Sequence, residues 1–282
     1  MDEMILDETE LCFGEVHYEK RLVFFFDILG WKNEIDTAGE DPRHIGRLAS
    51  AVRMFNATAA QVGDAGARIT TFSDNVVFSK PFEPGEVHWL LQSLAITQLG
   101  LAVHGFWMRG GVTIGNLYHD EHIVFGPALN RAYHLESKLA QFPRVLLDPL
   151  AMEAPIGTDF ISLGEEQFLD PFSPRFWDRI QRELPIQQQT LDRFNELSGA
   201  KIQSQPVMVS GGTALSSVAN RLSMELTSTE DPKVWMKLGW LFDRVVRALG
   251  GQAKADMLPK TPGLIAALAV ASAKFEGIAP QA

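Results

Sequence analysis

Residues 22–26 are five consecutive apolar residues of strand-forming type, a pattern typical of a buried strand, and the run ends at Asp27. Further along, two shorter strand-like runs at residues 68–72 and 76–79 lie on either side of Ser73–Asp74–Asn75. Ser, Asp and Asn are turn formers, so this stretch predicts a hairpin with the Asp74 carboxylate at its tip.

The rest of the chain alternates between helical and strand-like patterns. Apolar residues at three- and four-residue spacings predict helices at 45–55, 87–103, 130–142, 176–197 (with a break at Pro185) and 234–249. Strand patterns predict two more hairpins, pairing 106–114 with 123–129 and 160–163 with 167–169, and a strand at 144–148. Helices interleaved with hairpins favour an α+β sandwich, with a mostly antiparallel sheet covered by helices.

Composition adds limits on the setting of the protein. The net charge of −10 argues against sequence-independent binding of nucleic acid, which needs clustered Lys and Arg. Cys12 is the only cysteine, so an internal disulfide is excluded. The acidic N-terminus lacks the features of a signal peptide, and the apolar stretch at 264–273 is too short to span a bilayer. We therefore expect a cytoplasmic protein that does not act at a membrane.

The change in composition near Pro174 predicts two parts. Residues 16–174 form the α+β domain, and residues 175–282 form a helical extension that covers the sheet or makes a dimer contact.

Two acidic residues stand out against the predicted fold. Asp27 follows a buried strand, where an unpaired charge is costly. Alone it is explained by capping of the next helix or by pairing with an Arg, and Asp74 alone is explained by its turn. If the first strand and the hairpin are neighbours, both carboxylates reach one edge of the sheet, where Mg²⁺ or Mn²⁺ would offset their charge. Gly30 then begins a tight turn into a helix, whose N–H groups suit phosphate oxygens.

An ordered set of segments resembles the class III adenylate and guanylate cyclases. Residues 23–31 (VFFFDILGW) are similar to their first metal-binding segment and residues 70–77 (TTFSDNVV) to their second. The later core strands and helix resemble residues 109–115 (RGGVTIG), 125–130 (FGPALN) and 135–137 (LES). The likeness covers roughly residues 20 to 170 and is greatest to the stand-alone pyrimidine cyclases of bacterial anti-phage defence, called Pycsar.

This resemblance implies a metal-dependent cyclisation. Asp27, the carbonyl of Ile28, and Asp74 would bind two Mg²⁺ or Mn²⁺ ions, one lowering the pKa of the ribose 3′-hydroxyl and the other holding the triphosphate. The hydroxyl would attack the α-phosphorus in line and pyrophosphate would leave. In this family the site lies between two subunits, so the resemblance also implies a homodimer.

The same resemblance assigns the substrate contacts, listed here: Leu29, Gly30, Trp31, Thr70, Arg109, Ile123 and Phe125. Purine cyclases carry a Lys or Glu at the position of Thr70, and their second base-reading position is here Ile123. Both departures argue against the usual readout of adenine or guanine, without specifying uracil. The Trp31 ring itself is expected to be a core or interface aromatic.

Asn130 matches the ribose-orienting Asn, but the transition-state Arg expected four residues later is replaced by His134. The role of this Arg could fall to Arg131, if it bends into the site, to His134 itself, or to Arg109. The sequence leaves these three alternatives open. His134 also fits a partly buried helix histidine, and Arg109 also fits a structural charge at a strand edge.

We expect a lyase that converts UTP, or alternatively CTP, into a 3′,5′-cyclic monophosphate for antiviral defence. Its partner would be a separate effector protein that binds the cyclic nucleotide. A second hypothesis is a cyclase-fold nucleotide-binding protein that has lost catalysis, which the missing Arg at position 134 favours and the intact acid pair opposes. Cyclisation of ATP or GTP stays open. A dinucleotide cyclase or polymerase-palm relative is weakened because no Gly-Gly-Asp/Glu-Glu-Phe signature occurs.

Overall fold

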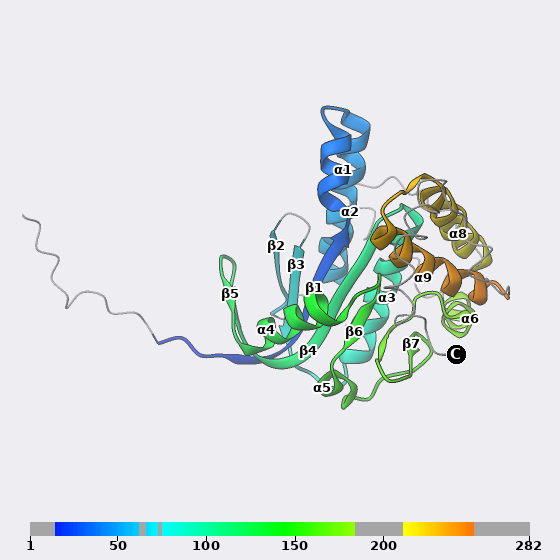
Figure 1. The fold of residues 1–282 in the computed structure, drawn as a ribbon. Coiled ribbons are helices and arrows are strands. Elements are labelled where there is room, and N and C mark those ends of the chain that lie inside the picture. The colour runs from blue at the N-terminus through cyan, green and yellow to red at the C-terminus, as the bar shows by residue number, and fades with distance from the viewer. Residues whose placement is uncertain (1–14, 62–65, 73–74, 184–210, 251–282) are drawn as a thin grey trace, which may run out of the picture.

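A computed structural model describes residues 15–61, 66–72, 75–183 and 211–250 of the 282-residue chain (Figure 1). Its strands are β1 (Glu19–Leu29), β2 (Arg68–Phe72), β3 (Asn75–Pro81), β4 (Trp107–His119), β5 (Val124–Phe125), β6 (Val145–Leu147), β7 (Ile161–Ser162) and β8 (Phe168–Leu169). The sheet order is β2-β3-β1-β4-β6-β8-β7, with β5 paired to the end of β4. Among these described strands only β4 and β6 run parallel to each other.

The helices lie on both sides of this sheet (Figure 1). They are α1 (Trp31–Ala38), α2 (Pro42–Gln61), α3 (Val87–Val103), α4 (Pro127–His134), the π-helix η1 (Leu135–Leu139), α5 (Pro149–Met152), α6 (Pro174–Glu183), α8 (Gly211–Ser228) and α9 (Pro232–Ala248). The predicted α+β class, with a mostly antiparallel sheet and C-terminal helices, is confirmed. Within the described residues, each helix is too short or too polar to cross a bilayer.

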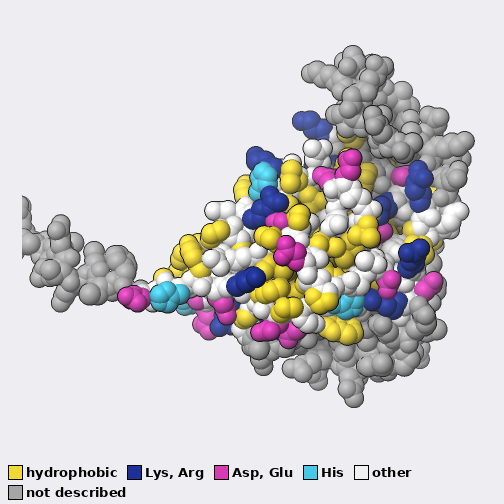
Figure 2. All heavy atoms as spheres, turned by 90° about the horizontal axis from the view of Figure 1, so that it is seen from below, with side chains coloured by type: hydrophobic (Ala, Val, Ile, Leu, Met, Phe, Trp, Pro, Cys, Tyr) yellow, Lys and Arg dark blue, Asp and Glu magenta, His cyan; other side chains and the backbone are white. Residues whose placement is uncertain are grey.

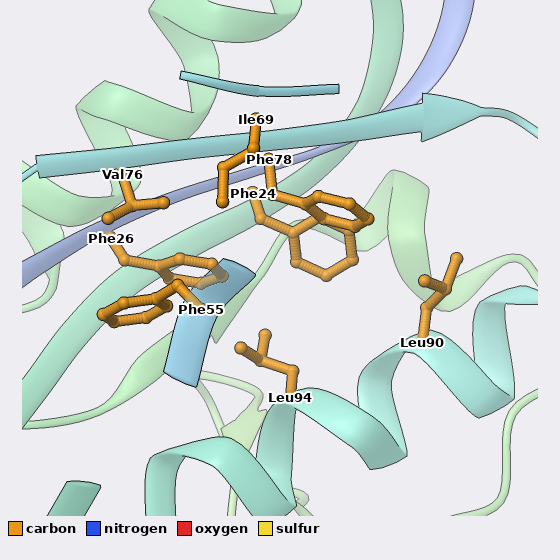
Figure 3. Close-up of a pocket in the computed structure, with 8 residues that line it drawn as sticks. All are labelled: Phe24, Phe26, Phe55, Ile69, Val76, Phe78, Leu90 and Leu94. Atoms are coloured by element: carbon orange, nitrogen blue, oxygen red, sulfur yellow. The ribbon is translucent and has the colours of Figure 1, made fainter. Parts of the chain in front are cut away.

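Strand alternation gives β1 two different faces. Its even-numbered residues point into the main core, where Phe24 and Phe26 meet Phe55 of α2 and Leu94 of α3 (Figure 3). Its odd-numbered residues point to the other side, where the Phe25 ring lies 5.4 Å from that of Tyr133 in α4. We call this second side the α4 face. Asp27, the next odd-numbered residue of β1, belongs to it.

The structure confirms most predicted elements and corrects several. The strand at 22–26 does not end at Asp27, because pairing with β4 continues to Leu29 opposite Trp107. The strand predicted at 123–129 is wrong beyond Phe125, since Pro127 starts α4. Its predicted pairing with 106–114 is also wrong, because β5 pairs with Tyr118 and His119 at the end of β4. Proline suits the first helical position, where its missing N–H would have no intrahelical partner. The helix predicted at 130–142 therefore begins three residues earlier, and its second half is the π-helix η1.

Other predictions fall partly or wholly outside the described residues. The helix at 176–197 is described only as far as Glu183, and Cys12, Asp74 and residues 264–273 are not described. Helix α8 was not predicted.

The C-terminal helices share a hydrophobic cluster with the sheet and α3. Leu238 and Leu241 of α9 and Leu222 of α8 are buried together with Trp107 of β4, and Leu29 packs against the same cluster. The Trp107 indole N–H also donates to the Glu225 carboxylate of α8, at 2.6 Å. The division at residue 174 stays a prediction. The packing fixes α9 beside the end of β1, which brings it next to the candidate site (Figure 1).

Candidate active site

Asp27 lies almost buried on the α4 face, with 8% of its surface exposed. Its partner in the β1–β4 register is Arg109, and the Arg109 Nε donates to Asp27 Oδ2 at 2.8 Å. A buried carboxylate needs such a partner because removing a charge from water is costly. The predicted metal ligand and the predicted substrate contact are therefore in direct contact with each other.

A second buried carboxylate, Glu136 of η1, reaches the same guanidinium. Arg109 Nε lies 2.6 Å from Glu136 Oε1, and only 2% of Glu136 is exposed. Gly111, two residues after Arg109 on the same face, permits this close packing. A Cβ atom there would lie 2.4 Å from Leu135 Cβ and 2.5 Å from the Ala132 carbonyl oxygen. Asp27, Arg109 and Glu136 thus form a group of two carboxylates and one cation, which we call the acidic cluster.

Lys237 of α9 lies near this cluster, close enough for the charges of Arg109 and Asp27 to act on it. One helical turn on, the Trp240 ring stacks on Phe142 at 5.1 Å and packs against the hydrophobic cluster that includes Leu135, the residue before Glu136. On its other side, Leu238 belongs to the cluster that contacts Leu29, two residues after Asp27.

The pKa of Lys237 is lowered, first by burial and then by the charge of Arg109, while the charge of Asp27 acts in the opposite direction. Among the described residues the Lys237 ammonium has no hydrogen bond or ion pair, which leaves it available to a ligand.

The β2–β3 hairpin brings Phe72 and Asn75 to the same end of β1. Phe26 pairs with Val76, so Asp27 and Asn75 are the next residues of the two neighbouring strands. Asp74, which precedes Asn75, is not among the described residues. Its position in the chain is consistent with the prediction that it joins Asp27.

The turn after β1 has the form that the sequence predicts. Gly30 adopts φ +76°, a conformation that favours glycine, and its carbonyl accepts the first hydrogen bond of α1, from the Glu34 N–H at 3.0 Å. The Trp31 ring is buried, 5.9 Å from that of Phe106, so it is a core aromatic. The Ile28 side chain is buried in the main core, on the face opposite Asp27. The backbone of this turn is what remains for ligand contacts.

Helix α4 presents three of the predicted residues to solvent. Asn130, Arg131 and His134 are all exposed. Arg131 Nε donates to Asp148 Oδ2 at 2.5 Å, and Asp148 is a buried carboxylate that also accepts from Thr113. This ion pair holds Arg131 to the residue that follows β6. Arg109 is the one of the three catalytic candidates that contacts Asp27.

Thr70 takes part in a polar chain on the α4 face. Its Oγ1 lies 2.8 Å from Nε2 of His119, and Nδ1 of that ring lies 2.8 Å from Ser79 Oγ. Ser79 Oγ accepts from Arg21 Nε, also at 2.8 Å. Burial lowers the pKa of His119 to about 4, and the charges of Arg21 and Arg68 act in the same direction. His119 is therefore neutral near pH 7.

Ile123 and Phe125 lie on the arm formed by β5 and the end of β4. Both are exposed, Ile123 at 51% and Phe125 at 43%. The Phe125 ring stacks on Tyr118 at 5.1 Å and meets the edge of Tyr18 at 5.9 Å. Figure 2 shows acidic, basic and apolar side chains interspersed over one face of the molecule, so that face carries no field of one sign.

The acidic cluster fits a divalent metal in its donor type. Mg²⁺ and Mn²⁺ prefer carboxylate oxygens, and Asp27 and Glu136 supply them in a buried position. Within the described residues no three His, Cys, Asp or Glu side chains converge on one point. A metal held here would need Asp74 in addition.

Several of these residues were missed in the sequence. Glu136, His119 and Lys237 were given no role. His119 lies at the two-residue spacing that begins at Arg109, but the predicted strand stopped at residue 114. Lys237 lies near the site only because α9 packs against the sheet, and such packing between distant segments has no local pattern in the sequence.

Comparisons with known proteins find similarity at the level of structure. No family model and no curated protein matches the chain. The adenylyl cyclase CyaB from P. aeruginosa is 16% identical, with a TM-score of 0.44 over 55% of this chain and 94% of that one. The dimeric guanylyl cyclase domain of the RhoGC fusion protein from the aquatic fungus Blastocladiella emersonii is 13% identical, with a TM-score of 0.37 over 55% and 94%.

A class III adenylyl cyclase-like ATP-binding protein from Pseudomonas aeruginosa is 14% identical, with a TM-score of 0.40 over 93% of this chain and 72% of that one. Scores at this level leave the activity of the chain to be argued from its own residues.

Proposed function

We propose that the protein is a metal-dependent nucleotidyl cyclase that converts a pyrimidine nucleoside triphosphate, preferably UTP, to its 3′,5′-cyclic monophosphate. The proposal is carried by the acidic cluster, in which two buried carboxylates share the Arg109 guanidinium beside the hairpin that contains Asp74. Carboxylate oxygens are the ligands that Mg²⁺ and Mn²⁺ prefer, and this cluster holds two carboxylates in a buried position.

In the proposed reaction Asp27, the Ile28 carbonyl and Asp74 would hold two Mg²⁺ or Mn²⁺ ions. Such ions would lower the pKa of the ribose 3′-hydroxyl and supply positive charge for the phosphates. A bond forms between the 3′-oxygen and the α-phosphorus, the α–β bridging P–O bond breaks, and the hydroxyl proton passes to water. Catalysis here consists mainly of positioning and charge stabilisation.

The positively charged side chains of this protein are suited to stabilising the charge on the phosphates. Arg109 contacts Asp27 and would place a positive charge beside phosphate oxygens bound there. Lys237 adds a charge from α9, and the backbone at Gly30 lies at the start of α1. The C-terminal helices would then contribute to substrate binding as well as to packing.

A homodimer follows from the same proposal. Asn130 and His134 are exposed on α4, as residues that act in the site of a partner subunit need to be. In that arrangement the metal ligands come from one subunit and the ribose contacts from the other. Ile123 and Phe125 on the exposed arm are available for the same interface.

A binding role without catalysis is the second candidate. It is favoured by the ion pair between Arg131 and Asp148, which occupies the arginine nearest in sequence to the expected transition-state position. A protein of this kind would bind the nucleotide and form no product.

The biological setting is proposed from the resemblance to the Pycsar cyclases. The product would act in the cytoplasm as an alarm signal during phage infection, and a separate effector protein would bind it.

The test incubates the purified protein with each of the four ribonucleoside triphosphates and Mn²⁺ and resolves the products by mass. Asp27→Asn and Asp74→Ala remove the proposed ligands, and Asp36→Asn, at an exposed position of α1, is the matched control. A cyclic pyrimidine that only the two site variants lose would support the proposal. A cyclic purine would keep the mechanism and overturn the base assignment. Binding without product would favour the second candidate.

A further inference from the structure

Two neighbouring side chains of the edge strand β2 have the properties of a nucleobase contact. Thr70 is half-buried, and Phe72, two residues on and therefore on the same face, is 55% exposed. An exposed aromatic ring can stack on a base, and a hydroxyl beside it can bond to the edge of that base. This pair lies on the α4 face, as Asp27 does.

Thr70 is one end of a chain of hydrogen bonds through His119 and Ser79, and Arg21 at the other end fixes the direction in which they donate. A guanidinium donates only, so Arg21 Nε donates to Ser79 Oγ. A neutral imidazole has one N–H and one acceptor nitrogen. Two arrangements therefore satisfy the His119 ring. In the first, Ser79 donates to Nδ1 and Nε2–H donates to Thr70. In the second, Nδ1–H donates to Ser79 and Thr70 donates to Nε2.

Burial decides between the two arrangements. In the second, Ser79 accepts both from Arg21 and from His119, and its own proton has no acceptor among the described residues. Ser79 has 0% of its surface exposed, so this unmatched proton would be costly. In the first arrangement the unmatched proton belongs to Thr70, which is open to solvent or to a ligand. The first arrangement is therefore the stable one.

We propose that the Arg21–Ser79–His119 chain makes the Thr70 hydroxyl a donor, and that this donor selects the carbonyl O4 of uracil over the amino group of cytosine. Uracil presents an acceptor at that edge and cytosine presents a donor. Thr70 would be the contact with the base, and His119 a positioning residue that acts through it. This inference rests on the proposed function, and it names the pyrimidine that the sequence leaves open.

The neutral state of the ring is part of the inference. The positive charges of Arg21 and Arg68 and the burial of the ring all disfavour an imidazolium, which would donate from both nitrogens. A doubly protonated ring would also donate to Ser79, and the polarity of the chain would no longer be set from Arg21.

The tautomer can be read without any ligand. In ¹⁵N-histidine-labelled protein at pH 7, two-bond ¹H–¹⁵N spectra separate a protonated Nε2 from a protonated Nδ1, and His119→Asn assigns the signals. We expect Nε2 to carry the proton. A protonated Nδ1 would overturn the inference, whatever the protein does with nucleotides.

Base selection is then measured as dissociation constants for 3′-deoxy-UTP and 3′-deoxy-CTP with Mn²⁺, neither of which can be cyclised. Thr70→Val should lower the preference for the uracil nucleotide by about tenfold, equivalent to about 1.4 kcal/mol. Thr71→Val, at the exposed next position of the strand, should leave it unchanged. Ser79→Ala should lower the preference while Thr70 remains in place, because either tautomer then becomes possible.

The outcomes separate this inference from the proposed function. Selection of uracil that depends on Thr70, with no cyclic product, would support the inference and contradict the cyclase. Cyclisation with a preference for cytosine, or with one that Thr70→Val does not change, would overturn the inference and leave the cyclase intact. Failure to bind either pyrimidine nucleotide would overturn the inference as well.

Discussion

Asp27 and Arg109 face each other across β1 and β4, directly opposite in the strand register, with the arginine Nε 2.8 Å from Asp27 Oδ2. Backbone pairing thus fixes which cation meets the buried carboxylate. The same guanidinium also reaches Glu136 from η1, so one arginine is shared by two acids. The first two predictions follow from this arrangement.

Asp27→Asn should reduce cyclisation by more than about 100-fold, because it removes a charged metal ligand and keeps the shape of the side chain. The amide still accepts a hydrogen bond from Arg109, so we expect the Tm to change little. Turnover of UTP and a thermal melt on the same sample check both statements. If the variant retained its turnover of UTP, Asp27 would not be a metal ligand.

Arg109→Ala should destabilise the fold by about 3 kcal/mol, because it leaves two buried carboxylates without their shared partner. Adding Glu136→Gln should restore part of this loss, since one of the two charges is then neutral. Urea unfolding of the single and double variants measures the coupling. Strictly additive effects would mean that the two residues do not interact.

Lys237→Ala should weaken the binding of inorganic tripolyphosphate and of UTP by roughly tenfold, since it removes a positive charge near the acidic cluster. Lys233→Ala, one turn earlier on α9 and exposed, is the matched control. Calorimetric titration of both variants checks the difference. Equal affinities of the two variants would mean that α9 contributes only to packing and not to ligand binding.

His119 makes stability depend on pH in a defined window. Its pKa is about 4 in the folded protein against 6.5 in a solvated histidine, so between these values the unfolded chain binds more protons. The free energy of unfolding should therefore fall as the pH falls from about 6.5 to 4, by on the order of 3 kcal/mol at about 1.4 kcal/mol per pKa unit. His119→Asn should lack this part of the slope in urea unfolding across that range, and parallel curves for the two proteins would contradict the assignment.

The sequence predicts the elements of this fold well where the pattern is local. The five-residue apolar run gives β1, and the spacing from Val87 to Val103 gives α3. It fails where tertiary pairing extends or interrupts an element. β4 runs on to His119 because β1 pairs with it as far as Leu117 and β5 pairs with its last two residues. The predicted single helix after Asn130 changes to a π-helix over the close contact at Gly111.

The candidate site divides in the same way. Asp27 was identified from its position after a buried strand and Arg109 from the resemblance to the cyclases, and the structure brings them together. Glu136, His119 and Lys237 enter through contacts between elements far apart in the chain, and a single sequence does not show such contacts. The sequence pattern also did not predict that Asn130 and His134 are exposed. The buried residues of this helix, Ala128 and Ala132, have the same four-residue spacing as this exposed pair, so spacing alone does not tell which pair faces inward.

The alternation of β1 also affects how this protein can change during evolution. Even-numbered positions such as Phe24 and Phe26 determine whether the chain folds, and the odd-numbered Asp27 points to the other side of the sheet. β4 divides in the same way, with Met108 in the core and Arg109 at the site. A mutation that changes the ligand contacts at Asp27 or Arg109 therefore leaves the main core on the other side of the sheet unchanged. Val23, Phe25 and Leu117 form a second, smaller core on the α4 face, so variation that spares the fold is confined to the ends of these strands.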